Sequence, residues 1–189
     1  MRKFWEFLKI VIISAVIILP IRYFIIQPFY VKGASMEPTF HDHEYLIIDE
    51  ISYRFKAPIR GDIVVFRYPE DPQEYFIKRI IGLPSEKIEI RDGQVSIYND
   101  QNPEGLALDE SAYLADSVKT YDVSGEIISL RDNEYFVMGD NRNSSKDSRS
   151  FGPVNSSFLT GRVIFRGWPF KKVTIFKTPT FNTSNANIN

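Results

Sequence analysis

The first thirty residues carry one long apolar run, unlike the rest of the chain. From Leu8 to Ile26 the charged residues are Lys9 and Arg22, near the two ends, where long side chains can reach water. The run is about long enough to cross the hydrocarbon core of a bilayer, so we predict a single transmembrane helix. Arg2 and Lys3 precede it, and this excess of positive charge favours a cytoplasmic N-terminus and an external remainder.

Two alternatives for this run are a buried core helix and a cleavable secretory signal. A signal cleaved after Ala34 needs small residues at both −3 and −1, and Lys32 would stand at −3. The run is also longer and more aromatic than an ordinary signal. We therefore expect the helix to be retained.

Beyond Val31 the pattern changes to short runs rich in Ile, Val, Phe and Tyr, separated by turn residues. Such runs without a sustained helical period indicate strands, whose edges must be closed or covered. We predict a mainly β protein in which the helix precedes an all-β domain of coiled antiparallel sheets or a partly open barrel. Asp92-Gly93 is a strong two-residue hairpin signal. The predicted strands are Tyr45–Asp49, Asp62–Tyr68, Tyr75–Ile81, Lys87–Arg91, Gln94–Tyr98, Glu134–Met138 and Arg162–Arg166.

The domain organisation follows from these patterns. Residues 1–30 form the cytoplasmic N-terminus and the membrane anchor, and residues 31–177 form the β-domain. The polar stretch 99–124 carries Pro103 and Gly105 and is predicted to be a small excursion from the barrel. Residues 178–189 form a polar tail, which we expect to be disordered. A chain of 189 residues leaves no room for a second large domain.

Composition excludes several classes of function. Lys and Arg total 23 against 24 Asp and Glu, so the basic footprint of a nucleic-acid-binding protein is missing and no nucleic-acid partner is expected. The chain has no cysteine, so it has neither disulfides nor thiolate metal sites, and this absence leaves the compartment open. His41 and His43 are its two histidines, which restricts histidine chemistry to this pair.

Ser35 is a candidate nucleophile because it lies in a loop just beyond the predicted membrane helix. Gly33 and Ala34 keep bulky side chains away from it, and Pro38 favours an irregular turn. A loop serine that is merely solvated or caps a helix is the common alternative.

Lys78 is a candidate general base. Strand alternation places Phe76 and Ile80 on the same face as Lys78. If that face is covered, desolvation lowers the lysine pKa, and a neutral amine can accept a proton near neutral pH. A lysine on the exposed face of an edge strand is the alternative.

A dense polar segment from Met138 to Pro153 follows a predicted strand. Its hydroxyls could orient a catalytic lysine, and its paired charges could lock the geometry of a site. A surface loop that hydrogen-bonds its own backbone is the alternative. The hydroxyls belong to Ser144, Ser145 and Ser148, and the charges to Asp140, Arg142, Asp147 and Arg149.

Four segments in this order, together with the N-terminal apolar helix, resemble the bacterial type I signal peptidase family along nearly the whole chain. Any one segment alone is a weak signal, whereas agreement of all four is specific. The segments are Ser35-Met36-Glu37-Pro38-Thr39, Arg60–Phe66, Lys78–Pro84 and Gly139–Arg149.

The resemblance implies a Ser/Lys dyad. Ser35 attacks the scissile carbonyl, Lys78 takes its proton and later protonates the leaving amine, and Ser145 hydrogen-bonds and orients the lysine. The oxyanion hole uses the backbone N–H of Ser35 and a donor two residues upstream. That position is Gly33, which has no hydroxyl, so stabilisation rests on backbone donors. No metal or cofactor is required.

The resemblance also implies roles for residues around the dyad. Asp140 pairs with Arg79, and Asp147 pairs with Arg149, as structural supports. Met36 shapes the shallow pockets for small substrate residues, with a core thioether as the alternative. Departures from the family pattern are Ser85-Glu86, commonly Gly-Asp, and Asn143, commonly Asp. The short excursion resembles that of minimal, Gram-positive members.

The function implied is that of a membrane-bound endopeptidase that removes signal peptides from exported preproteins after Ala-x-Ala sites. Its partners are preproteins and membrane lipid, and its localisation is the cell membrane, single-pass, with the catalytic domain outside. The alternatives are a self-cleaving cytosolic Ser–Lys regulatory protease, an inactive family member that acts as a scaffold, and a membrane-tethered peptide-binding domain.

Overall fold

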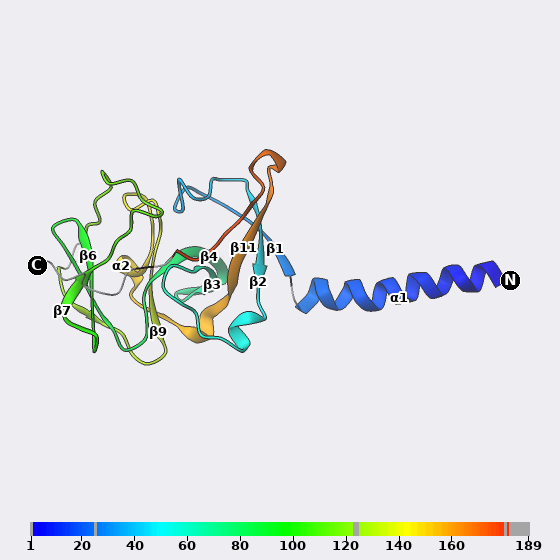
Figure 1. Cartoon of the computed structure of the whole chain (residues 1–189), viewed down its shortest axis with the longest axis horizontal. Helices are drawn as coiled ribbons and strands as arrows, with labels where there is room; N and C mark the ends of the chain where they lie inside the picture. The colour runs from blue at the N-terminus through cyan, green and yellow to red at the C-terminus, as the bar shows by residue number, and fades with distance from the viewer. Residues whose placement is uncertain (1, 25, 123–124, 180, 182–189) are drawn as a thin grey trace, which may run out of the picture.

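A computed structural model describes residues 2–24, 26–122, 125–179 and 181, with the side chains of residues 19–27 left outside the description. Helix α1 (Arg2–Phe24) extends away from a body made of two antiparallel sheets (Figure 1). The first sheet contains β1 (Ile26–Tyr30), β2 (Tyr45–Asp49), β3 (Ile63–Tyr68), β4 (Asp71–Gly82), β9 (Glu134–Met138), β10 (Val154–Asn155), β11 (Leu159–Trp168) and β12 (Thr174–Ile175). The second contains β5 (Lys87–Arg91), β6 (Gln94–Asn99), β7 (Asn102–Ala107) and β8 (Ile128–Ser129).

The N-terminal helix differs from its expected bounds at both ends. It begins at Arg2 rather than Leu8, and it ends at Phe24, so that Ile26 already belongs to β1. Within the described residues, no helix combines the length and the apolarity that a membrane crossing needs. The expected span runs into residues 19–27, whose side chains are not described.

Strand β1 is not among the predicted strands, the first of which begins at Tyr45. β1 pairs antiparallel with β2, with Pro28 opposite Ile47, and it lies at the edge of the larger sheet. Proline lacks a backbone donor but is tolerated on an edge strand, where one side of the ladder is unpaired. Strand β1 therefore begins two residues after the end of α1, and it leads into the loop that contains Ser35.

The larger sheet runs in the order β1-β2-β11-β3-β4-β9-β10, with β12 paired to β11. The mainly β, antiparallel prediction is confirmed, and β2, β5 and β9 have the predicted bounds. The Asp92-Gly93 hairpin is confirmed too: both residues have positive φ, 53° and 82°, and they join β5 to β6. Short 3-10 turns flank the strands at Ser52–Arg54, Ser156–Phe158 and Phe170–Lys172.

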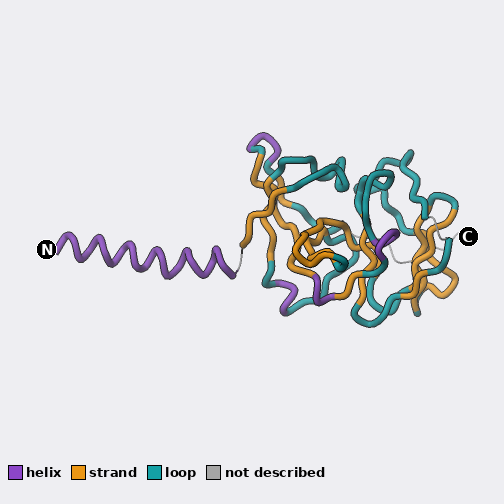
Figure 2. The backbone as a smooth tube through the Cα atoms, turned by 180° about the vertical axis from the view of Figure 1, so that it is seen from behind, coloured by secondary structure: helices purple, strands orange, loops and turns teal. Residues whose placement is uncertain are grey.

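The smaller sheet runs in the order β7-β6-β5-β8 and stands apart from the larger one in the tube view (Figure 2). The predicted excursion contributes a strand to this sheet, since β7 pairs with β6 despite Pro103 and Gly105. The two sheets share a hydrophobic core, in which Ile81 and Phe136 of the larger sheet pack with Ile88 and Ile97 of the smaller. The excursion is therefore packed against the body of the protein.

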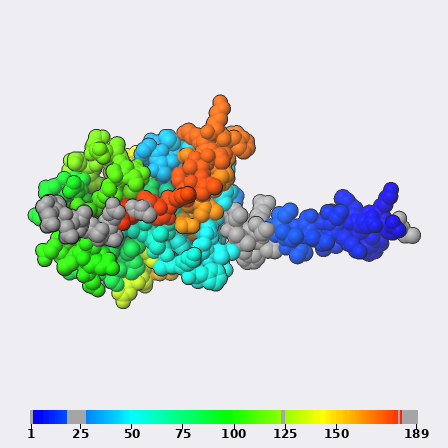
Figure 3. All heavy atoms as spheres, in the orientation of Figure 1, coloured from blue at the N-terminus to red at the C-terminus, as the bar shows by residue number. Residues whose placement is uncertain are grey.

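The segment after β12 crosses the body toward the smaller sheet (Figure 3). Thr178 Oγ1 donates to the buried Asp62 carboxylate, and Phe181 makes an edge contact with Tyr113. The expectation of a disordered tail from residue 178 is therefore wrong for its first residues, because a buried carboxylate needs donors. Residues 182–189, also assigned to the tail, lie outside the described residues.

Candidate active site

Ser35 lies in the loop between β1 and β2, and that loop is anchored at both ends. Val31 N–H donates to Glu44 O, and His43 N–H donates to Val31 O. Gly33 has a φ of +84°, a backbone conformation that glycine adopts without strain. Its N–H donates to Asp42 Oδ1 at 2.9 Å, so this expected oxyanion donor already has a partner.

Lys78 lies in β4, and its side-chain amine contacts the side chain of Ser35. Its Nζ lies 2.8 Å from Ser35 Oγ and also donates to Ile77 O at 3.0 Å. Lys78 is 3% exposed, and Val64 of β3 lies opposite it in the ladder. The expected covered face is present, and the alternative of an exposed edge lysine is excluded.

Burial lowers the pKa of Lys78 to about 8, although the carboxylates of Asp147 and Asp140 act in the opposite direction. Burial destabilises the charged ammonium more than these two carboxylates stabilise it, because each carboxylate is already paired with an arginine. A substantial fraction of Lys78 is therefore neutral in mildly alkaline solution. A neutral amine 2.8 Å from a hydroxyl can accept its proton, which is the geometry of a general base beside a nucleophile.

The polar segment after β9 folds tightly against Ser35. Gly139 N–H donates to Asp147 Oδ2, and Gly139 O accepts from Arg142 Nε, both at 3.0 Å. A Cβ at Gly139 would overlap Ser145 Oγ and the Ser35 carbonyl oxygen. Only glycine allows this segment to approach Ser35 so closely.

Ser145 does not make the expected hydrogen bond to Lys78. Its Oγ is buried against Gly139, and the hydrogen bonds of the Lys78 amine go elsewhere. The Lys78 amine is instead oriented by Ser35 Oγ and Ile77 O. Sequence reasoning could identify the loop but not the direction of one hydroxyl, because that direction depends on the fold of the whole segment.

Both expected ion pairs are present and shielded from water. Arg79 Nε and Nη2 donate to the two oxygens of Asp140 at 2.8 and 2.6 Å, with the side chains 4% and 0% exposed. Arg149 Nε and Nη2 donate to Asp147, both at 2.8 Å. Burial opposes ionisation of Asp147, but Arg149 and the Gly139 N–H hold its pKa below the usual range. Such two-pronged pairs fix orientation as well as charge.

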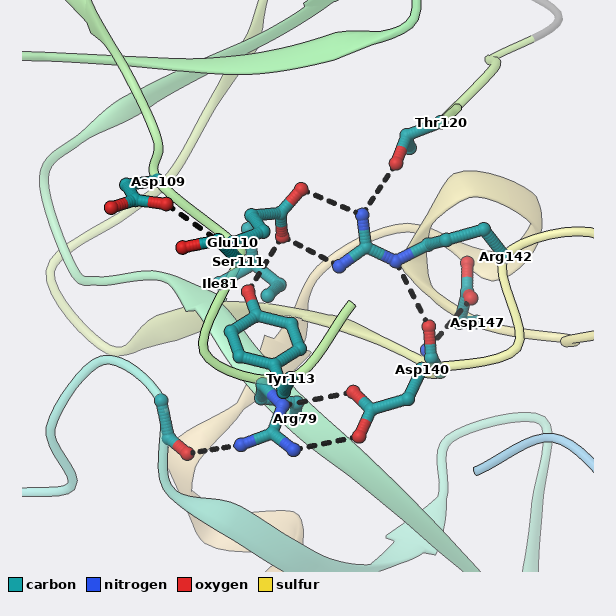
Figure 4. A network of polar contacts seen from close by, with 12 residues as sticks. Arg79, Ile81, Asp109, Glu110, Ser111, Tyr113, Thr120, Asp140, Arg142 and Asp147 are labelled. Atoms are coloured by element: carbon teal, nitrogen blue, oxygen red, sulfur yellow. Dashed lines mark hydrogen bonds and ion pairs between the residues drawn. The ribbon is translucent and has the colours of Figure 1, made fainter. Parts of the chain in front are cut away.

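A second layer of this network comes from the excursion and was not foreseen (Figure 4). Arg142, whose side chain is fully buried, donates to both carboxylate oxygens of Glu110 at 2.8 and 2.6 Å and to Thr120 Oγ1. Tyr113 donates to Glu110, and its ring lies 4.0 Å from the Arg79 guanidinium carbon. These residues come from a segment with little hydrophobic pattern, so no local signal marked them.

Met36 is placed in the core rather than in a substrate pocket. It is 1% exposed and packs with Phe40, Leu46 and Val65 beneath the nucleophile loop. This is the core thioether that the sequence left as the alternative. An apolar side chain beside Ser35 gains more by filling the sheet interior than by facing solvent.

Ser85 and Glu86, which depart from the family pattern, both form hydrogen bonds in the folded protein. Ser85 has a φ of 66°, where glycine would be relaxed, and its Oγ donates to Asp132. Glu86 is buried and accepts from Arg60, Asn99 and the Leu83 N–H. Neither residue contacts the Ser35–Lys78 pair, and Asn143 is exposed.

A groove of about 570 Å³ opens onto Ser35 and Lys78. Residues 29–32 line it on the side of β1, residues 73–78 line it on the side of β4, and both Ser35 and Lys78 face it. In the described chain, β1 is an outer strand, and residues 71–78 of β4 pair only with β3. Two unpaired strand edges therefore border the groove.

Comparisons with known proteins agree on one family. A family model described as "Signal peptidase, peptidase S26" matches residues 4–168. The chain is 37% identical over 171 residues to "Probable signal peptidase I-2" of Synechocystis sp., covering 87% of this chain and 73% of that one. It is 29% identical over 193 residues to "Signal peptidase IB" of Staphylococcus aureus, covering 98% of each. A solved signal peptidase I from Enterococcus faecalis, 31% identical, aligns with a TM-score of 0.46 over 57% of this chain and 97% of that chain.

Proposed function

The chain belongs to the signal peptidase family, peptidase S26, and is a signal peptidase enzyme, and from this premise we propose that it cleaves signal peptides from exported preproteins with a Ser35–Lys78 dyad. The observation that carries the proposal is the 2.8 Å contact between Ser35 Oγ and the buried Lys78 Nζ. The low pKa of Lys78, about 8, gives the amine the protonation state that the role needs.

The proposed reaction has two stages. Neutral Lys78 accepts the Ser35 proton while Oγ attacks the scissile carbonyl, and the resulting ammonium protonates the departing amine. Water then attacks the ester carbon while neutral Lys78 takes its proton, and the ammonium returns that proton to Ser35 Oγ as the ester bond breaks and the new C-terminal carboxyl group is released. The Ser35 N–H stabilises the oxyanion at both stages, a contribution worth about 3–4 kcal/mol for one such donor in other hydrolases.

Substrate binding follows from the groove. We propose that the segment around the cleavage site pairs as an extended strand with the exposed edges of β1 and β4, which gives affinity without a sequence requirement. Shallow apolar contacts near Ser35 then select small residues, which is the Ala-x-Ala preference. Phe29, Val31 and Ile77 are candidates for this contact surface, because each lines the groove.

This function is tested with the full chain in detergent and a purified preprotein carrying an Ala-x-Ala site. We expect one cut after the final Ala, identified by mass spectrometry, and no cut with Ser35→Ala. Ser144→Ala, which changes an exposed serine, should cleave like wild type. Undiminished cleavage by Ser35→Ala would refute the dyad, and no cleavage by folded wild type would favour a binding or scaffold role.

We also propose that residues 1–30 anchor the enzyme to the membrane in a single pass, with residues 31–177 as the external catalytic domain. Supporting this, described side chains on α1 such as Trp5, Ile10 and Ile17 are each more than half exposed, and the helix stands clear of the body (Figure 1). An apolar helix with this exposure calls for lipid as its partner. Confinement to the membrane plane raises the effective concentration of membrane-bound preproteins.

The topology is testable because the chain has no cysteine. In intact cells, a membrane-impermeant thiol reagent should label a cysteine introduced at the exposed Arg131 but not one introduced at Lys3. After lysis both should react. Labelling of position 3 in intact cells, or protection of position 131, would overturn the proposed orientation.

A further inference from the structure

Asn141 is bonded to the backbone on both sides of the Ser35 α-carbon. Its backbone N–H donates to Ser35 O, and its side-chain Nδ2 donates to Ala34 O, both at 3.1 Å. A carbonyl oxygen can only accept, so the side-chain amide must present its NH₂ group to Ala34. The loop after β9 therefore holds the nucleophile loop at two successive peptide groups.

The bond to Ala34 O determines where the Ser35 N–H points. The Ala34–Ser35 peptide is trans, so its carbonyl oxygen and its N–H lie on opposite sides of the peptide plane. Fixing the oxygen toward Asn141 turns the N–H away from Asn141. Among the described residues the Ser35 N–H has no acceptor, so it remains available to a substrate.

In the described chain, Asn141 is the only residue outside the β1–β2 loop that donates a hydrogen bond to the Ala34–Ser35 peptide group. The other donor to Ala34 O is Glu37 N–H, which belongs to the same turn and would move with it. The alternative oxyanion donor, the Gly33 N–H, is already bonded to Asp42. Stabilisation of the oxyanion therefore depends more on the Ser35 N–H than on the Gly33 N–H, and so on the direction in which the Ser35 N–H points.

Asn141 is itself held rigidly by its neighbours in the sequence. Asp140 is fixed by the buried pair with Arg79, and Arg142 is bonded to Gly139 O and Glu110. Asn141 O also accepts from Ser144 N–H at 3.0 Å. Asn141 therefore links the ion-pair network directly to the two peptide groups that flank the Ser35 α-carbon.

We propose that Asn141 is a positioning residue that aims the Ser35 N–H at the substrate oxyanion. The proposal rests on the proposed function, in which Ser35 is the nucleophile. The N–H matters most when the carbonyl oxygen becomes negative, so Asn141 acts on the transition state more than on substrate binding.

The test compares Asn141→Ala, Asn141→Asp and Asn143→Ala in the full chain in detergent. Asn141→Asp keeps the shape and the backbone N–H but removes the side-chain donor, and Asn143 is an exposed asparagine two residues away. Both Asn141 variants are expected to lower kcat by about 10²-fold, the loss typical of one oxyanion donor, with KM changed less than about threefold. Asn143→Ala should match wild type.

The affinity for a peptide aldehyde inhibitor distinguishes this role from a merely structural one, because a purely structural residue would not change that affinity selectively. Ser35 Oγ adds to the aldehyde carbon, its proton passes to Lys78, and the carbonyl electron pair moves onto the oxygen, which gives a hemiacetal oxyanion. The aldehyde should lose about as much affinity as kcat loses, while a peptide alcohol of the same sequence keeps its affinity. The apparent pKa of kcat/KM should stay near that of wild type, because Lys78 keeps its contacts.

The outcomes separate this proposal from the proposed function. If wild type fails to cleave, or Ser35→Ala still cleaves, the proposed function fails. If those two behave as expected but both Asn141 variants retain kcat within about threefold, or lose kcat with unchanged aldehyde affinity, the role of Asn141 is refuted. Should Asn141→Ala unfold, as judged by circular dichroism, the near-isosteric Asn141→Asp decides alone.

Discussion

Replacing Lys78 with methionine is expected to lower the rate constant for preprotein cleavage by about 10⁴-fold or more, the loss seen when a base that acts with a serine nucleophile is removed. Methionine keeps the length and apolar stem of lysine, so the space between Val64 and Ser35 stays filled. What disappears is the nitrogen 2.8 Å from Ser35 Oγ. The measurement is single-turnover cleavage in detergent, which isolates the chemical steps from product release.

The matched control is Lys146→Met. Lys146 lines the same groove, but its side chain is 56% exposed and pairs with Glu70 at 3.5 Å. This control removes the same charge from the groove without touching the dyad, so its cleavage rate should stay within a few-fold of wild type. Equal losses in the two variants would show that positive charge in the groove, rather than proton transfer at Lys78, supports the reaction.

The pH dependence provides an independent reading of Lys78. Its folded pKa of about 8 predicts that kcat/KM of wild type rises with pH up to about 8 and then levels, because only the neutral amine accepts a proton. The unfolded lysine keeps its pKa near 10.5, so between these values the unfolded state binds more protons and stability rises with pH. Urea unfolding should show this rise from pH 8 to pH 10 in wild type, and a smaller one in Lys78→Met.

Replacing Asp140 with alanine is expected to lower the free energy of unfolding by about 3–5 kcal/mol, the cost of leaving one member of a buried ion pair alone. Arg79 is 4% exposed and makes two bonds to this carboxylate, and Thr39 donates to it as well. No described acidic group is bonded to Arg79 in its place. Urea denaturation followed by tryptophan fluorescence measures the change.

Two further variants sharpen this test. Arg91→Ala removes a pair between Glu89 and an arginine that is 77% exposed, and should cost less than about 1 kcal/mol. The double variant Arg79→Met, Asp140→Leu removes both charges and should be more stable than Asp140→Ala, because no unpaired ion remains. A loss below about 1 kcal/mol for Asp140→Ala would mean that water reaches Arg79 in the folded protein.

Much of the architecture could be predicted because it follows from short-range patterns. Short runs rich in Ile, Val, Phe and Tyr, bounded by turn residues, predicted the bounds of β2, β5 and β9, and Asp92-Gly93 alone identified the hairpin between β5 and β6. Strands such as β8, β10 and β12 were missed, since two residues are too few for any alternation to be visible. β7 was missed because Pro103 and Gly105 argue against a strand, and only its pairing with β6 stabilises it there.

The sequence by itself determined that one helix precedes a mainly β domain, which side chains share a strand face with Lys78, and the ion-pair partners implied by the family pattern. Only the tertiary structure decided that the face of Lys78 is covered, that Met36 fills the core, that the Ser145 hydroxyl makes no hydrogen bond to Lys78, and that Glu110 balances Arg142 from 32 residues away. The reason is physical. Backbone propensity and alternation act between neighbours along the chain, whereas burial, charge pairing and the aim of a hydroxyl depend on which distant segments the folded sheets bring together.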